Sequence, residues 1–122
     1  MLSLQVYKLA HLLGLFLVFT SLGGLVLHAM NGGDRESNQR RGLVFATHGI
    51  GLLLVLVSGF GMLARLGIHG VPGWAAVKLV IWLVIGGLVA LPQRVPAAAR
   101  FVWFLAPALA LVAGWLALYK PF

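Results

Sequence analysis

The sequence has no cysteine and only two acidic residues, Asp34 and Glu36, in a chain of 122. Charged residues make up 9% and hydrophobic residues 61% of it, whereas a soluble domain carries about 25% charged residues. The lack of cysteine excludes a disulfide-stapled mini-protein. The scarcity of charge excludes a soluble enzyme and a disordered chain. What is left is an integral membrane protein whose length allows one domain.

Basic residues are in excess, since nine Lys and Arg give a net charge of +7. They are scattered at the ends of apolar segments rather than gathered in a stripe, so nucleic acid is not expected as a partner. The expected partner is the lipid bilayer. We expect a multi-pass protein of a bacterial inner (cytoplasmic) membrane.

Four apolar stretches reach the roughly 20 residues that a helix needs to cross the hydrocarbon core. They cover residues 4–30, 43–66, 74–91 and 97–119. The one hydrophilic run, residues 31–41, must be a loop, and a Gly/Pro turn separates the second and third stretches. Short connections predict an all-α integral membrane protein, an antiparallel bundle of four transmembrane helices that forms a single domain over residues 1–122. No internal repeat is evident.

Three of the four histidines, His11, His28 and His48, fall within these spans. Ionisable groups there cost several kcal/mol unless they are paired or act as ligands, so each is a functional candidate. At about 1.5 Å per residue, His11 and His28 lie roughly 25 Å apart along one helix, so one haem or metal ion cannot bind both. The fourth, His69, lies in the Gly/Pro turn, where a surface role is expected.

His28 is near the end of the first span and His48 near the start of the second, so similar depths are expected for them. Two imidazoles that face each other across a bundle are what bis-histidine ligation of haem b requires. The other interpretation makes both histidines interfacial residues, hydrogen-bonded to the loop or to lipid headgroups.

His11 belongs to the opposite end of the bundle, together with Lys78 of the third span. Lys78 shares a helix face with Trp74 and Trp82 at intervals of four. Either its long side chain extends outward to the headgroups, or it points inward and pairs with a carboxylate such as a porphyrin propionate. In the second case His11 is an axial ligand or a proton acceptor, and both residues are candidates for catalysis and cofactor binding.

Other chemistries find no residues to support them. The chain has no cysteine, and both acidic residues lie in one arginine-rich loop. The sequence therefore offers no set of ligands for a metal–carboxylate site. Ser58 has no base nearby in the sequence, which gives no support to nucleophilic catalysis.

Five fragments stand out along the chain: Tyr-Lys-Leu-Ala-His-Leu at 7–12, Leu-His-Ala at 27–29, Arg-Arg at 40–41, Trp-Ala-Ala-Val-Lys-Leu at 74–79 and Lys-Pro-Phe at 120–122. Together they resemble membrane protoporphyrinogen oxidases of the HemJ type and the related four-helix proteins of the copper-resistance CopD type. The third-span opening and the C-terminal tripeptide are the more specific. The fragments are spread in the same order over all four spans.

This resemblance implies a four-helix membrane bundle that binds haem b and oxidises protoporphyrinogen IX to protoporphyrin IX. It implies His11 as the leading haem ligand, Lys78 as an essential lysine and His28 as a further site residue. The chain departs from the family at residues 86–90, Gly-Gly-Leu-Val-Ala, where a Tyr-His pair is expected. It also departs at His48, where an apolar residue or proline is expected.

Two functions follow as hypotheses. In the first, the protein is a haem b-binding redox protein that takes electrons from a tetrapyrrole and passes them to quinone or another membrane carrier. His11, His28 and His48 are then the candidate iron ligands. In the second, it is a non-catalytic small transmembrane subunit of a respiratory or photosynthetic complex. A homo-oligomer or a larger membrane complex is compatible with both.

Overall fold

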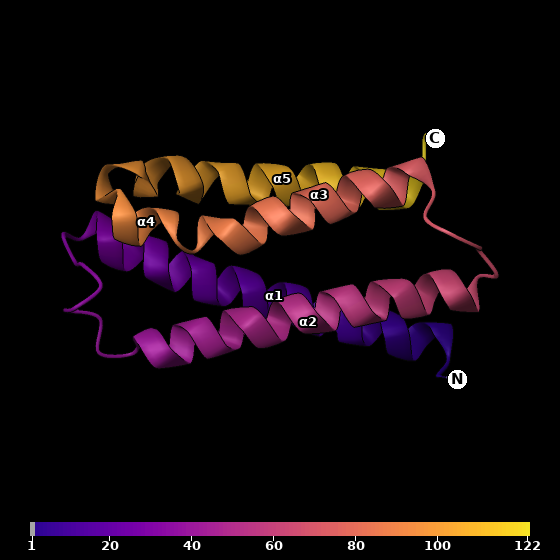
Figure 1. Cartoon of the computed structure of the whole chain (residues 1–122), viewed down its shortest axis with the longest axis horizontal. Coiled ribbons are helices and arrows are strands. Elements are labelled where there is room, and N and C mark those ends of the chain that lie inside the picture. Colours follow the sequence, from indigo (N-terminus) through magenta and orange to yellow (C-terminus); the bar gives the residue numbers. More distant parts are fainter. Residues whose placement is uncertain (1) are drawn as a thin grey trace.

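A computed structural model of the chain describes residues 2–122, and this range is helical with no strand. The prediction of an all-α fold is confirmed. The elements are α1 (Leu4–Met30), α2 (Arg41–Arg65), α3 (Gly73–Leu88), the short α4 (Leu91–Arg94), the 3₁₀ turn η1 (Pro96–Ala98) and α5 (Ala99–Tyr119), shown in Figure 1.

Four helical segments are long and apolar enough to cross a membrane, which is the number that the sequence predicts. They are Leu4–Met30, Arg41–Arg65, Gly73–Arg94 and Pro96–Tyr119. Their lengths are 27, 25, 22 and 24 residues. Each is therefore sufficient for a hydrocarbon core that needs about 20 residues.

The third segment is interrupted, although its apolar sequence runs on to Leu91. The amide N–H of Ala90 donates to the carbonyl of Gly87 at 3.1 Å, so the last turn tightens and α3 ends at Leu88. Pro92 lacks an N–H and could not continue the helical ladder. The chain turns here and begins the short α4, which leads through η1 into α5.

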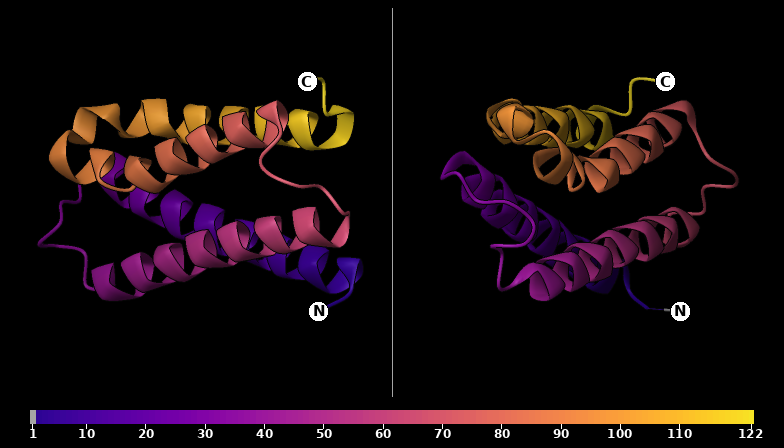
Figure 2. Two further views of the ribbon diagram at one scale, coloured as in Figure 1. Left: turned by 45° about the vertical axis from the view of Figure 1, so that its right-hand side comes forward. Right: turned by 60° about the vertical axis from the view of Figure 1, so that its left-hand side comes forward.

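Two helix pairs make up the bundle, as Figures 1 and 2 show: α1 crosses α2, while α3 lies beside α5. The apolar core gathers buried side chains of α1, α3 and α5, and α5 contacts both of the other helices. Its most deeply buried members are Val18, Leu22, Leu25, Val26, Ala99, Val102 and Leu116. By contrast, α2 buries only three residues, His48, Gly51 and Ser58.

The crossing of α1 and α2 is set by one glycine from each helix. A Cβ atom added to Gly14 would lie 2.8 Å from the carbonyl oxygen of Gly51, and one added to Gly51 would lie 2.8 Å from that of Gly14. Backbones this close leave room only for hydrogen on the α-carbon. The two glycines therefore fix which residues of α1 and α2 face each other.

Candidate functional site

Two histidine–serine pairs lie on either side of this crossing. The Nδ1 atom of His11 is 2.9 Å from the hydroxyl oxygen of Ser58, and Nδ1 of His48 is 3.4 Å from that of Ser21. Each pair joins α1 to α2, and the order of the contacts shows that the two helices run in opposite directions. His48, Ser21 and Ser58 are buried, whereas His11 is half-buried.

The two pairs come from an internal repeat that our sequence analysis missed. Residues 11–21 and 48–58 share the pattern His-x-x-Gly-Leu-x-Leu-Val-x-x-Ser. The contacts repeat as well: a Cβ on Gly14 would meet a Val55 methyl at 2.9 Å, and one on Gly51 a Val18 methyl at 2.8 Å. The helix pair therefore has local two-fold pseudo-symmetry. Most of the shared residues are Leu, Val and Gly, which are common throughout this chain and conceal the repeat.

Each serine hydroxyl also contacts a carbonyl of its own helix. The Ser58 oxygen is 2.5 Å from the Leu54 carbonyl oxygen, and the Ser21 oxygen is 2.8 Å from that of Leu17. Such bonds to the preceding turn are usual for serine within a helix. They hold each hydroxyl in place beneath its histidine ring.

The two imidazoles differ at their other nitrogen. Nε2 of His48 is 3.4 Å from the carbonyl oxygen of Gly86, which the tightened end of α3 leaves free. One turn along both helices, the indole N–H of Trp82 donates to the Leu52 carbonyl at 3.0 Å. The Trp82 bond and the contact between His48 and the Gly86 carbonyl join α3 to α2.

Nε2 of His11, in contrast, has no hydrogen-bond partner within residues 2–122, and it is not among the fully buried nitrogens of that range. A methyl group added to Gly59 would lie 3.7 Å from the ring carbon Cε1 of His11, which is an ordinary contact distance. One nitrogen of the His11 imidazole is thus accessible to a ligand.

Lys78 lies at the same end of the bundle as His11. It is one turn before Trp82, on the helix face that meets α2, and it is half-buried. The register set by the contacts of Trp82 and Gly86 places Lys78 opposite Leu56, two residues from Ser58.

The surroundings of Lys78 are cationic. The ammonium of Lys120 lies 5.3 Å from the ring centre of Trp74, and the Phe122 carbonyl accepts the Trp74 amide N–H at 3.3 Å. Both acidic residues of the chain are in the loop at the opposite end. Neither acidic side chain is therefore available to neutralise these ammonium groups.

His28 contacts the loop instead of His48. Its Nε2 atom is 2.9 Å from the carbonyl oxygen of Asp34 and 3.2 Å from the Ser37 hydroxyl. The α1–α2 register places His28 opposite Arg41, the first residue of α2, whereas His48 is two turns further along. The structure does not bring the two imidazoles together.

The loop that holds His28 is itself closed by reciprocal bonds. The Ser37 amide N–H donates to a carboxylate oxygen of Asp34 at 2.8 Å, and the Asp34 amide donates to the Ser37 hydroxyl at 2.9 Å. The bond from the Ser37 amide, together with a smaller contribution from its side chain, holds the pKa of the Asp34 carboxyl below its usual value.

The remaining sequence candidate, His69, is exposed in the turn between α2 and α3. Within residues 2–122, no three His, Cys, Asp or Glu side chains converge on one point. A metal ion held by three or more such side chains is therefore not supported among these residues. A haem iron differs, because the macrocycle supplies four of its ligands and the protein only the axial ones.

The known proteins offer no guide here. No family model, no curated protein and no solved structure matches this chain. Its chemistry must be argued from the residues themselves.

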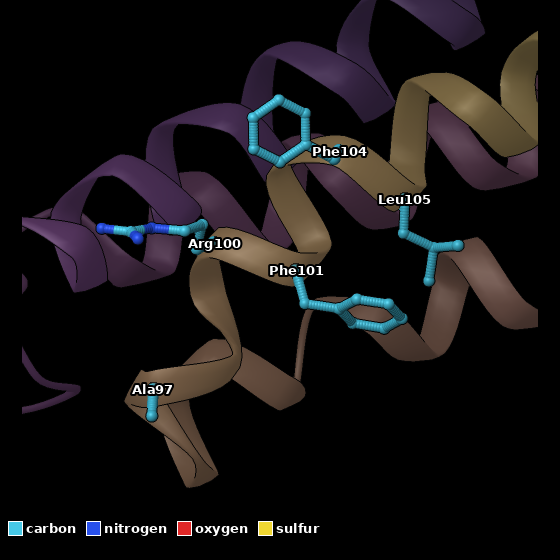
Figure 3. Close-up of a pocket in the computed structure, with 5 residues that line it drawn as sticks. All are labelled: Ala97, Arg100, Phe101, Phe104 and Leu105. Carbon is cyan, nitrogen blue, oxygen red and sulfur yellow. The ribbon is translucent and has the colours of Figure 1, made fainter.

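An open groove lies away from these histidines, along η1 and the start of α5, with a volume of about 550 Å³. Figure 3 shows its lining side chains, all from this single stretch of chain: Ala97, Arg100, Phe101, Phe104 and Leu105. One arginine beside apolar side chains is usual where a helix meets lipid. The groove contains none of the predicted site residues.

Proposed function

We propose that this protein is a haem b-binding membrane redox protein, built as an antiparallel bundle of four transmembrane helices, with His11 as an axial ligand. The observation that carries the proposal is the His11 ring, whose Nδ1 is held by Ser58 while Nε2 has no protein partner. An imidazole within a membrane-length helix is costly unless it is paired or acts as a ligand. Ligating histidines characteristically have their second nitrogen held in this way.

The residues around His11 fit a haem in their chemistry. The ammonium of Lys78 would bind a propionate, since neither acidic side chain of the protein lies at this end of the bundle. Gly59 lies beside the His11 ring and has no side chain that would compete with a ligand there. Trp82 lies one turn further along α3 than Lys78 and would help to exclude water from a macrocycle.

A bound haem supplies one-electron redox chemistry. The resemblance noted above suggests oxidation of protoporphyrinogen IX, with electrons passed on to quinone or another membrane carrier. In this assignment Lys78 binds and orients a carboxylate of the tetrapyrrole, and His11 positions the iron. His28 and His48 are the candidates for a second ligand or a second haem, although both rings already contact protein groups.

One feature favours a second candidate, a non-catalytic small subunit of a respiratory or photosynthetic membrane complex. The faces of α2 and α5 carry many exposed large apolar side chains, such as Leu53, Val57, Leu111 and Leu118. Lipid, a second copy of the chain or a larger partner would cover them. In that role the histidines would serve helix packing and headgroup contacts.

A reduced-minus-oxidised absorption spectrum of protein purified in mild detergent, after expression with ample haem, tests the first proposal. We expect a b-type spectrum in the wild type. We also expect its loss in His11→Ala and its persistence in His69→Ala, the matched control whose ring is exposed in a turn. His28→Ala and His48→Ala show whether either ring is a second ligand.

Two results would overturn the haem assignment. A colourless wild type found only within a larger assembly supports the subunit instead. A haem spectrum that survives His11→Ala would leave the haem in place but remove His11 as its ligand. If haem is bound, oxidation of protoporphyrinogen by the wild type and by Lys78→Met tests the reaction.

A further inference from the structure

We propose that Ser58 is a positioning residue: it fixes the proton of the neutral His11 ring on Nδ1 and so leaves the Nε2 lone pair free for an external ligand. The inference rests on the proposed function for the identity of that ligand, a haem iron. The geometry itself does not depend on the haem.

The Ser58 hydroxyl has a single proton to donate. The Leu54 carbonyl oxygen is 2.5 Å from the hydroxyl oxygen and can only accept, so the hydroxyl proton must lie between these two oxygens. Towards His11 the hydroxyl then presents only lone pairs. Nδ1 of His11, 2.9 Å away, must therefore be the donor.

A neutral imidazole carries one N–H, so a proton on Nδ1 leaves Nε2 unprotonated. This is the form that binds a metal through Nε2, because coordination uses the nitrogen lone pair. Ser58 thus does for His11 what outer-shell acceptors do in metal sites: it sets both the tautomer and the direction of the ring.

The pseudo-symmetric pair shows the contrast. His48 faces two acceptors, the Ser21 hydroxyl oxygen and the Gly86 carbonyl, each at 3.4 Å. The Ser21 proton is held by its own helix at Leu17, and a neutral ring has only one N–H for the two acceptors. The same motif therefore produces one imidazole with an open nitrogen and one with both nitrogens against protein oxygens.

The test is nitrogen NMR of the imidazole rings in haem-free protein labelled with ¹⁵N-histidine, because the shifts of the two ring nitrogens identify the tautomer. In the wild type we expect His11 with its proton on Nδ1. In Ser58→Ala the ratio of the Nδ1–H to the Nε2–H form should fall by about fivefold, the factor that one ordinary hydrogen bond is worth.

Ser21→Ala is the matched control, since it removes the equivalent hydroxyl from the other half of the repeat. It should leave His11 unchanged and shift His48 towards the Nε2–H form, which bonds to Gly86. Unchanged shifts of His28 and His69 would show that each variant is folded.

A wild-type His11 with its proton on Nε2 would overturn the proposal, and this measurement needs no variant to fold. So would a His11 tautomer that responds equally to both serine substitutions, since that would indicate a general loosening of the helix pair. If the tautomers behave as expected but no haem b spectrum is found, the role of Ser58 stands and the haem assignment fails.

Discussion

Three polar side chains are buried in this bundle, Ser21, His48 and Ser58, and all three lie between α1 and α2. Each has a hydrogen-bond partner, as burial in an apolar medium requires. The half-buried His11 completes the set. The polar residues of the helix pair thus form two separate His–Ser pairs and not one continuous hydrogen-bonded chain.

Asp34 allows a prediction on the loop that holds His28. Bonds from Ser37 lower the pKa of the Asp34 carboxyl, so the folded protein binds its proton less readily than the unfolded chain does. The stabilisation is present above the ordinary carboxyl pKa and is lost as pH falls through the lowered folded value. Carbon-detected NMR should show Asp34 titrating below the range of an unperturbed carboxyl.

Ser37→Ala provides the check on that cause. It keeps the amide donor, which makes the larger contribution, and removes the hydroxyl. The Asp34 pKa should therefore move only part of the way back towards its ordinary value. If the Asp34 pKa returned fully to its ordinary value, the Ser37 side chain and not the amide would be responsible for the shift. If the Asp34 pKa did not change, the Ser37 hydroxyl would have no part in it.

At the scale of a residue, the sequence identifies the histidines but not their partners. Their cost in an apolar helix marks them as special, whereas Ser21 and Ser58 look like ordinary small residues. Depth alone suggested that His28 and His48 would meet. The loop ends before Arg41, however, so His48 lies two turns inside α2 and reaches Ser21 instead.

At the scale of an element, the close approach of α1 and α2 depends on glycine. In Gly14→Ala the new methyl would lie 2.8 Å from the Gly51 carbonyl oxygen, so the helices must separate. We expect the loss of about 1–3 kcal/mol that is typical of overpacking. Unfolding in detergent, followed by circular dichroism, measures it.

Gly49→Ala is the control for that substitution, because a methyl there meets nothing within 4 Å. Alanine in place of glycine within a helix should stabilise α2 by about 0.5–1 kcal/mol. The two variants thus have opposite expected signs. Equal stability of Gly14→Ala and Gly49→Ala would show that the crossing does not need its glycines.

Helix bounds were largely predictable, because long apolar runs bounded by loop residues leave few choices. Only the third span differs in kind: its composition continues to Leu91, while the backbone turns after Leu88. The break arises because the Ala90 amide donates to the Gly87 carbonyl instead of the Gly86 carbonyl. Hydropathy carries no information about this choice of hydrogen bond. The freed Gly86 carbonyl then becomes the partner of His48.

At the scale of the whole molecule, four membrane-length segments imply that successive loops lie on opposite sides of the bilayer. The chain has no cysteine, so single cysteines can be placed without background. Glu36→Cys marks the loop after α1 and His69→Cys the turn after α2. Both positions are exposed, and neither side chain has a hydrogen bond within residues 2–122.

An impermeant maleimide applied to intact cells should label one of these two cysteines, and the other only after the membrane is opened. The reason is that α2 lies between them and is long and apolar enough to cross the bilayer. Labelling of both from the same side would mean that α2 does not cross. The His11–Ser58 pair would then lie outside the hydrocarbon, and the cost that makes His11 a ligand candidate would disappear with it.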